Sequence, residues 1–196
     1  MKNLFLSLLL LPFLSFAQLR EKVTIEGDNF KIEYSEVLEQ PLFVSYTIPC
    51  VYGSVSNSRR NLNFHTNDTI HTSNNGDYYK NVWDKGHMMP AASFDCDKEL
   101  LKYTFTYLNC ALQHKDLNRK QWKYLESYEN KLTQYGDVYV EINIIFTEFS
   151  EKLESGATVP SYFQKKIYLN GDLYGIWKFP NMENPDQNVN SFKIKN

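Results

Sequence analysis

The chain has 196 residues, of which 42% are hydrophobic and 15% aromatic, and this content is typical of one globular domain with a substantial core. The formal net charge of -2 gives no sign of a polyanionic partner, so any such binding would depend on local clusters of basic residues. A glycine-rich phosphate loop is absent from the sequence, which argues against a P-loop nucleotide hydrolase or a dinucleotide-binding domain.

Residues 1–17 are predicted to form a cleaved export signal. Lys2 precedes an apolar run from Leu4 to Phe16, and small residues before and at Ala17 have the spacing of a signal-peptidase site. The run is shorter than the roughly 20 apolar residues that a membrane-spanning helix needs. We therefore expect a secreted or periplasmic protein without stable membrane association, with one domain at residues 18–196.

The segment after the signal predicts three strands and then a long loop. Residues 22–27, 30–36 and 41–48 alternate apolar and polar side chains or are rich in β-branched and aromatic residues, as strands are. Residues 52–78 are rich in Ser, Asn, Thr and Gly, which predicts a loop. Long loops in compact domains are often functional, and this one carries Arg59 and Arg60, although a solvated surface pair would look the same.

The C-terminal half predicts further strands and one helix. Residues 102–110 alternate like a strand, and apolar spacing predicts a helix from about Arg119 to Gln134, with Asn118 or Asp116 near its N-cap. Residues 138–149 predict a buried strand, and residues 162–180 a hairpin closed by a two-residue Asn-Gly turn. This order of elements predicts an α+β fold.

Three cysteines, Cys50, Cys96 and Cys110, leave the disulfide pattern open. In an exported chain they are compatible with one disulfide and one free thiol, or with no disulfide. The absence of a Cys-x-x-Cys pair argues against a structural zinc site. The sequence places no base next to a cysteine, so it does not indicate a cysteine nucleophile.

A candidate general base lies in the stretch NVWDKGHMMPAASFD, which runs from residue 81 to residue 95. His87 follows Asp84 by three residues and Gly86 directly, so we expect the glycine to let the backbone bend and expose the ring. An imidazole titrates near neutral pH and suits proton abstraction from water. A structural histidine is the alternative, as for the other three histidines, His65, His71 and His114.

A second segment offers oxygen ligands for a metal ion. Asn109, Asn118 and Glu126 carry the oxygen donors that a hard cation such as Mg²⁺ prefers. On an α-helix, Asn118 and Glu126 would be separated by about 80° of rotation and about 12 Å of rise. We therefore expect Asn118 to bind the metal directly and Glu126 to lie in its outer shell. An ordinary N-cap and an exposed helix charge are the alternatives.

Together, these segments resemble the DNA/RNA non-specific endonuclease family, whose members are ββα-metal nucleases like endonuclease G. The family's Asp-Arg-Gly-His motif, followed by an apolar run with alanines, resembles residues 84–92. Its later Asn, Leu-Asn, aromatic and Leu-Glu positions resemble Asn109, Leu117-Asn118, Trp122 and Leu125-Glu126. The resemblance extends weakly over most of the chain after the signal.

The resemblance implies a central antiparallel sheet and a ββα-metal (His-Me finger) site, in which two strands and a helix hold one divalent ion. His87 would deprotonate water, and Asn118 would be the one protein ligand of Mg²⁺, with Mn²⁺ also possible. Asn109 would orient His87 or the substrate, and Glu126 would hold a water molecule near the metal. Family members cut DNA and RNA, leave 5′-phosphate ends and are often homodimers.

The resemblance also implies substrate-binding residues. Asp84 and Lys85 belong to the histidine motif, and an upstream arginine corresponds to Arg59 or Arg60. Arg60 is the candidate for stabilising charge on the phosphate and Arg59 for binding substrate, but the sequence does not decide between them. Lys85 replaces the usual arginine and loses its bidentate fork, so we expect arginine at position 85 to give equal or greater activity.

Two further departures lie in the loops, where the usual Pro-Gln and Thr-Gly-Pro are missing. One alternative hypothesis is therefore a nucleic-acid-binding relative with weakened catalysis. Another is an effector delivered to competing cells, which the plain export signal makes the weaker alternative. Metal-dependent nicking that disappears on substitution of His87 would separate a nuclease from a binding protein.

Overall fold

The computed structural model describes residues 19–183 and 188–195. The predicted export signal at residues 1–17 lies outside the described residues. Within the described part, no helix is long and apolar enough to cross a membrane.

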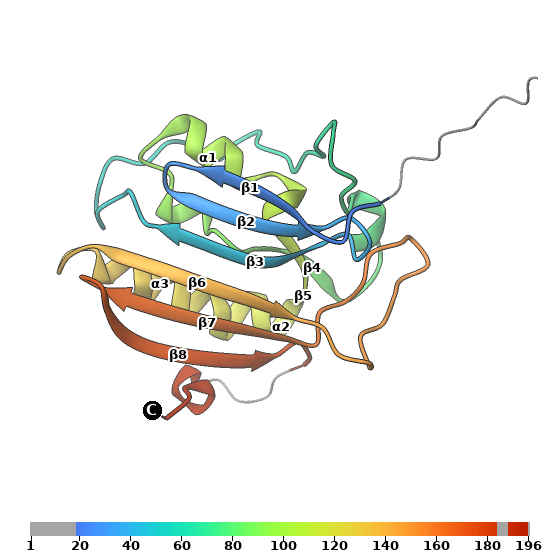
Figure 1. Cartoon of the computed structure of the whole chain (residues 1–196). Helices are drawn as coiled ribbons and strands as arrows, with labels where there is room; N and C mark the ends of the chain where they lie inside the picture. Colours follow the sequence, from blue (N-terminus) through green and yellow to red (C-terminus); the bar gives the residue numbers. More distant parts are fainter. Residues whose placement is uncertain (1–18, 184–187, 196) are drawn as a thin grey trace, which may run out of the picture.

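A six-stranded antiparallel sheet is the centre of the fold (Figure 1). The order across the sheet is β1 (Val23–Gly27), β2 (Phe30–Ser35), β3 (Gln40–Thr47), β6 (Val138–Ile145), β7 (Tyr162–Leu169) and β8 (Asp172–Pro180). The predicted α+β fold, the three N-terminal strands and the buried strand after residue 138 are confirmed. The predicted Asn-Gly turn between β7 and β8 is also confirmed, since Asn170 and Gly171 have φ of 52° and 86°.

A smaller unit supplies the remaining strands and helices. Strands β4 (Trp83–His87) and β5 (Cys110–His114) form an antiparallel pair. The helical segments are α1 (Lys98–Thr104), α2 (Lys115–Leu117), a π-helical turn η4 (Asn118–Trp122) and α3 (Lys123–Leu132). Short 3₁₀ turns are η1 (Asn75–Tyr78), η2 (Ala91–Ser93), η3 (Tyr107–Asn109) and η5 (Val189–Phe192).

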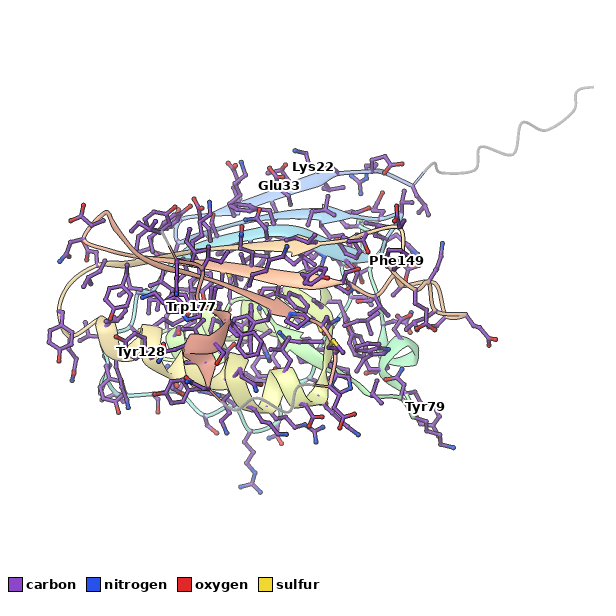
Figure 2. The ribbon with its side chains drawn as sticks, turned by 90° about the horizontal axis from the view of Figure 1, so that it is seen from below. Lys22, Glu33, Tyr79, Tyr128, Phe149 and Trp177 are labelled. Carbon is purple, nitrogen blue, oxygen red and sulfur yellow. A yellow bond between two sulfur atoms is a disulfide. The ribbon has the colours of Figure 1, made fainter. Side chains whose placement is uncertain are left out.

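The core lies between the sheet and the helices. Figure 2 shows the sheet as one layer and the helices as a second layer against it. Every second residue of β6, from Val138 to Ile144, is buried, and Trp122 and Leu125 from the helical segment pack into the same cluster. The helix that carries the candidate site is therefore fixed to the sheet by its apolar side.

Two sequence predictions were wrong in the segment from residue 98 to residue 123. Residues 102–110 do not form one strand: α1 and η3 occupy most of this range, because Asp97 caps α1 by accepting hydrogen bonds from the backbone of Glu99 and Leu100. The later helix begins at Lys115 rather than Arg119, and His114 is its N-cap, accepting a hydrogen bond from the backbone of Asp116.

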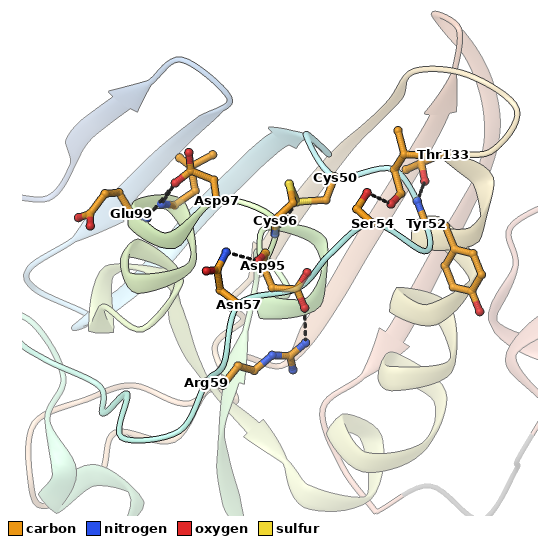
Figure 3. Close-up of a disulfide and its surroundings, with 12 residues drawn as sticks. Cys50, Tyr52, Ser54, Asn57, Arg59, Asp95, Cys96, Asp97, Glu99 and Thr133 are labelled. Atoms are coloured by element: carbon orange, nitrogen blue, oxygen red, sulfur yellow. Dashed lines mark hydrogen bonds and ion pairs between the residues drawn. A yellow bond between two sulfur atoms is a disulfide. The ribbon is translucent and has the colours of Figure 1, made fainter.

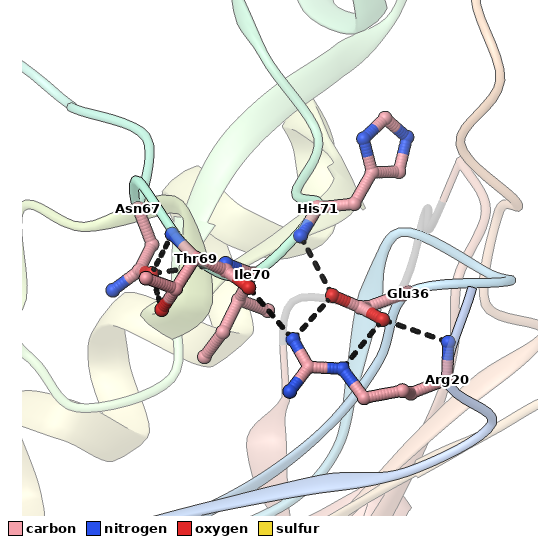
Figure 4. Close-up of polar contacts among 6 residues, drawn as sticks. All are labelled: Arg20, Glu36, Asn67, Thr69, Ile70 and His71. Atoms are coloured by element: carbon pink, nitrogen blue, oxygen red, sulfur yellow. Dashed lines mark hydrogen bonds and ion pairs between the residues drawn. The ribbon is translucent and has the colours of Figure 1, made fainter. Parts of the chain in front are cut away.

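Hydrogen bonds join the long loop after β3 to Arg20 and Glu36, which lie next to strands β1 and β2 (Figure 4). The guanidinium of Arg20 donates to both oxygens of Glu36 and to the carbonyl of Thr69, and the same carboxylate accepts the backbone N–H of His71. The hydrogen bond from Arg20 lowers the pKa of Glu36 to about 2. These contacts fix the part of the loop that precedes η1.

Candidate active site

The ββα unit positions His87 at the end of β4. His87 pairs with Cys110 at the start of β5, and the helical segment follows β5 directly. The indole Nε1 of Trp122 donates to the carbonyl oxygen of His87 at 3.3 Å, which joins the helical segment to the end of β4. Both strands and the helix therefore determine where the imidazole lies.

Gly86 has a different role from the one expected. It lies within β4, where a Cβ atom would come within 2.5 Å of the Gln113 side chain on β5. The glycine therefore permits the close approach of Gln113 rather than a bend of the backbone. The prediction of a bend before His87 was wrong.

A cavity of about 450 Å³ brings four of the eight candidate residues together. His87, Asn118, Glu126 and Arg59 all line it. The other lining residues are Tyr52, Pro90, Ala91, Ala92, Phe105, Lys123, Ser127, Asn130 and Lys131. Residues from β4, from the loop after β3 and from the helical segment thus meet around one space.

The imidazole of His87 lies between two phenylalanine rings. The centroids of Phe64 and Phe105 are 4.8 and 5.0 Å from that of the imidazole. Within the described part of the chain, the buried Nε2 atom has no hydrogen-bond partner. Burial, together with the nearby charge of Arg59, lowers the pKa of His87 to about 4. At neutral pH the ring is therefore uncharged and able to accept a proton.

Asp84 positions Asn118 instead of facing the cavity. Its Oδ2 accepts a hydrogen bond from Nδ2 of Asn118 at 3.0 Å, and Arg119 donates to both carboxylate oxygens at 2.8 and 2.7 Å. Burial raises the pKa of Asp84, but the hydrogen bonds from Arg119 and Asn118 outweigh it and hold that pKa below its ordinary value. Since a carboxylate only accepts, the amide of Asn118 must turn its nitrogen to Asp84, which leaves Oδ1 for a cation. The prediction that Asp84 binds substrate finds no support in this placement.

Glu126 lies on α3, one turn after η4. The π-helical turn between Asn118 and Glu126 replaces the regular α-helix assumed for their spacing. Burial raises the pKa of Glu126 to about 8; Lys165 opposes this shift and Glu129 adds to it. A divalent cation in the cavity would favour the ionised form.

Arg59, and not Arg60, is the arginine at the cavity. Its Nη2 lies 3.3 Å from Oδ2 of Asp95, and Asn57 also binds the backbone of Asp95 (Figure 3). The disulfide between Cys50 and Cys96 ties this loop to the segment that follows η2. Cys110 remains a free, buried thiol.

Arg60 does not line the cavity. Its catalytic role stays a prediction that this placement does not support, whereas its neighbour Arg59 lines the cavity. Among the two candidates that the sequence left open, the structure places Arg59 beside His87.

Asn109 lies beneath the cavity and does not line it. The side chain is fully buried: Nδ2 donates to the carbonyl oxygens of Met89 and Thr104 at 3.0 and 2.9 Å, and Oδ1 accepts from the Met89 backbone at 2.7 Å. Of the two roles expected for Asn109, this placement fits the positioning of the segment after His87. Contact with substrate does not fit, because Met89 and Thr104 occupy its polar atoms.

Lys85 also lies away from the cavity. Its ammonium binds Oδ1 of Asn75 and lies 5.5 Å from the centroid of the Phe64 ring, and Lys85 is not among the residues that line the cavity. Contact between Lys85 and substrate stays a prediction that this placement does not support.

Several cavity residues were not among the site residues predicted from the sequence. Lys123, Ser127 and Lys131 recur every four residues on α3, so they lie on one side of the helix with Glu126 and Asn130. That spacing was a usable signal, because it places two lysines beside Glu126. Tyr52 and Phe105 lie in segments whose sequence has no pattern that indicates a functional site.

The residues present fit a hard divalent cation. Asn118 offers a carbonyl oxygen and Glu126 a carboxylate in the same cavity. Among the described residues, no group of three or more His, Cys, Asp or Glu side chains could hold a metal ion. A site with few protein oxygens suits Mg²⁺, which keeps most of its water.

Comparisons with known proteins show the family and the fold of this chain. A profile of the DNA/RNA non-specific endonucleases matches residues 15–192. The chain belongs to the DNA/RNA non-specific endonuclease family. Among its relatives, mitochondrial endonuclease G of Bos taurus is 33% identical over a match of 127 residues that covers 57% of this chain and 42% of the relative. Nuclease C1 of Cunninghamella echinulata var. echinulata is 30% identical over a match of 136 residues that covers 61% of this chain and 54% of the relative.

The chain spans about half the length of these curated relatives. Its fold is similar to that in a crystal structure of the EndoG/EndoGI complex, with a TM-score of 0.76 and 22% identity over 92% of this chain and 82% of the other. This family member therefore has the fold of an endonuclease G over nearly its full length.

Proposed function

We propose that this chain is an exported endonuclease that hydrolyses phosphodiester bonds of both DNA and RNA with one divalent metal ion, Mg²⁺ or Mn²⁺, and leaves 5′-phosphate ends. The observation that carries the proposal is the cavity in which a neutral His87, the Oδ1 side of Asn118 and the carboxyl of Glu126 meet Arg59. Family membership supports the same reaction type.

Each of these cavity residues has a separate role in hydrolysis. His87 removes a proton from the attacking water, because its lowered pKa keeps it uncharged at neutral pH. Asn118 would hold the cation through Oδ1, since Asp84 accepts a hydrogen bond from its amide nitrogen. When bound there, the cation would neutralise charge on the scissile phosphate and the leaving 3′-oxygen. Arg59 stabilises negative charge on the same phosphate.

The remaining cavity residues favour contact with a sugar-phosphate backbone. Lys123 and Lys131 line the cavity together with Glu126 and attract neighbouring phosphates. Contacts of this kind position a nucleic acid without reading its bases. We therefore expect little sequence preference and cleavage of both polymers.

The direct test is digestion of supercoiled plasmid and of RNA by residues 18–196, with Mg²⁺, with Mn²⁺ and with EDTA. We expect cleavage of both polymers that stops in EDTA. Products with 5′-phosphate ends would accept label from polynucleotide kinase only after phosphatase treatment. Intact substrate that the protein still binds in Mg²⁺ would instead support the alternative of a weakened, nucleic-acid-binding relative.

Export is tested separately. Expression of the full chain in a bacterial host, followed by N-terminal sequencing of the periplasmic or extracellular protein, should give a first residue of Gln18. A chain that keeps residues 1–17 and stays inside the cell would contradict the export signal.

A further inference from the structure

The side chain of Lys85 occupies an aromatic cage next to the catalytic histidine. Lys85 precedes His87 by two residues on β4, so the two side chains leave the same face of the strand. The ammonium binds Oδ1 of Asn75, which also accepts the hydroxyl of Tyr107 at 2.8 Å. It lies 5.5, 5.8 and 5.4 Å from the ring centroids of Phe64, Tyr78 and Tyr107. We call Asn75, Phe64, Tyr78 and Tyr107 the Lys85 cage.

One wall of the cage is in contact with the imidazole. The ring of Phe64 packs against His87 with centroids 4.8 Å apart, and against Phe105 with centroids 5.4 Å apart. The backbone beside Phe64 is held as well, since His65 donates to Phe105 and accepts from Tyr107, both at 3.0 Å. A shift of the Phe64 ring therefore changes the space available to the imidazole.

We propose that Lys85 is a positioning residue, which holds Phe64 against His87 and so sets the orientation of the imidazole, instead of contacting phosphate. This inference rests on the nuclease function proposed above. The ammonium attracts the ring faces that surround it, and this attraction is electrostatic. Removing the charge would loosen Phe64, and with it the ring that accepts the proton.

The cage also accounts for lysine in place of the family's usual arginine. An ammonium is a compact charge on a flexible stem, whereas a guanidinium is a wide planar fork. Three rings and one amide oxygen lie around this compact charge, and we expect the wider guanidinium to displace Phe64. The expectation from sequence, that arginine at position 85 gives equal or greater activity, is therefore reversed.

Kinetics separate the two roles of Lys85. In Lys85→Met and in Lys85→Arg, we expect kcat to fall about tenfold or more, because misplacing a reacting group by about 1 Å can cost about 100-fold in rate. KM and the dependence of KM on salt should stay near those of the wild type. A lysine that binds phosphate would instead affect KM and its salt dependence, since a lost phosphate contact reduces the salt slope.

Two lysines provide matched controls. Lys123→Met removes a charge that lines the cavity and should raise KM and reduce its salt dependence. Lys22→Met removes a charge at the outer edge of the sheet, far from the helical layer (Figure 2), and should change neither constant. Wild-type or higher kcat in Lys85→Arg, or a loss in Lys85→Met confined to KM, would overturn the proposal.

An NMR measurement tests the same coupling without relying on activity. Ring currents of Phe64 and Phe105 act on the ring protons of His87, so their chemical shifts report how the rings are packed. Lys85→Met and Phe64→Leu should displace the His87 resonances in the same direction, and Lys22→Met should not. Unchanged His87 resonances in a folded Lys85→Met protein would overturn the positioning role, whereas a displacement in a protein without nuclease activity would support the coupling and count only against the proposed function.

Discussion

The buried ion pair beneath the cavity gives a quantitative prediction. Nζ of Lys165 lies 3.0 Å from Oε2 of Glu129, and neither side chain has exposed surface. The hydroxyl of Tyr46 donates to the other carboxylate oxygen at 2.6 Å, and the ammonium lies 4.2 Å from the centroid of the Trp122 ring. Lys165→Met keeps most of the apolar stem but leaves the carboxylate buried without its cation.

We expect Lys165→Met to lower the free energy of unfolding by about 3–5 kcal/mol, the range for breaking a buried pair on one side. Lys166→Met is the matched control, because Lys166, the next residue in β7, pairs with Glu141 at 3.2 Å while 30% and 23% of the two side chains stay exposed. That pair should contribute about 1 kcal/mol or less. Urea unfolding at pH 7, followed by tryptophan fluorescence, measures both losses.

The pH dependence of this loss follows from Glu129. Burial raises the pKa of Glu129, although Lys165 and Tyr46 oppose this, so loss of Lys165 raises the pKa further. Below the ordinary glutamate pKa both the folded and the unfolded states are protonated, and the ionic part of the loss disappears. At higher pH the unfolded chains of both proteins ionise alike, so the loss grows only as pH rises through the raised pKa of Glu129 in the folded wild type, where the wild-type carboxyl ionises beside Lys165 and that of the variant stays protonated.

A second substitution refines the test. Glu129→Gln combined with Lys165→Met removes both charges and should recover much of the lost stability. Equal losses for the two lysine variants, or a loss for Lys165→Met that does not change between pH 4 and pH 7, would refute the reasoning.

Three further predictions concern the cavity. Arg59→Ala should lower kcat/KM by about 100-fold, the typical cost of a group that stabilises charge in the transition state, whereas Arg60→Ala should have little effect; equal losses in plasmid cleavage would contradict the placement of Arg59. Asn118→Ala should weaken both Mg²⁺ binding and activity, and unchanged activity at low Mg²⁺ would exclude Asn118 as a ligand. Because the pKa of Glu126 is about 8 without a cation, Mg²⁺ binding should release a proton at pH 7 and tighten as pH rises towards 8; calorimetry in buffers of different ionisation enthalpy would show no released proton if Glu126 were already ionised.

Patterns of local origin allowed much of the fold to be predicted from the sequence. Alternation gave the strands of the main sheet, and Asn170-Gly171 identified its last hairpin, because both signals depend on neighbouring residues alone. The strand expected at residues 102–110 was wrong because the cap at Asp97 determines a helix that the aromatic alternation hides. The helix expected from Arg119 begins at Lys115 because His114 is its N-cap. The sequence did not indicate that His114 has this role.

The site could be predicted only in part, because some of its contacts join segments that are distant in the sequence. Motif spacing identified His87, Asn118 and Glu126, which share one cavity. The choice between Arg59 and Arg60 depends on a disulfide that joins segments 46 residues apart, which spacing does not reveal. Lys85 was misplaced because its environment is made by rings from three separate segments.

The measurement that tests the central claim most directly is the rate of plasmid cleavage by four single histidine-to-alanine variants. The chain has four histidines, His65, His71, His87 and His114, and only His87 lines the cavity. With folding checked by thermal unfolding, we expect His87→Ala to lose about 100-fold to 10,000-fold in kcat, the range for a general base, and the other three to stay within about tenfold of the wild type. Cleavage by His87→Ala at a rate near that of the wild type, or an equal loss in another histidine variant, would contradict the assignment of His87 as the general base.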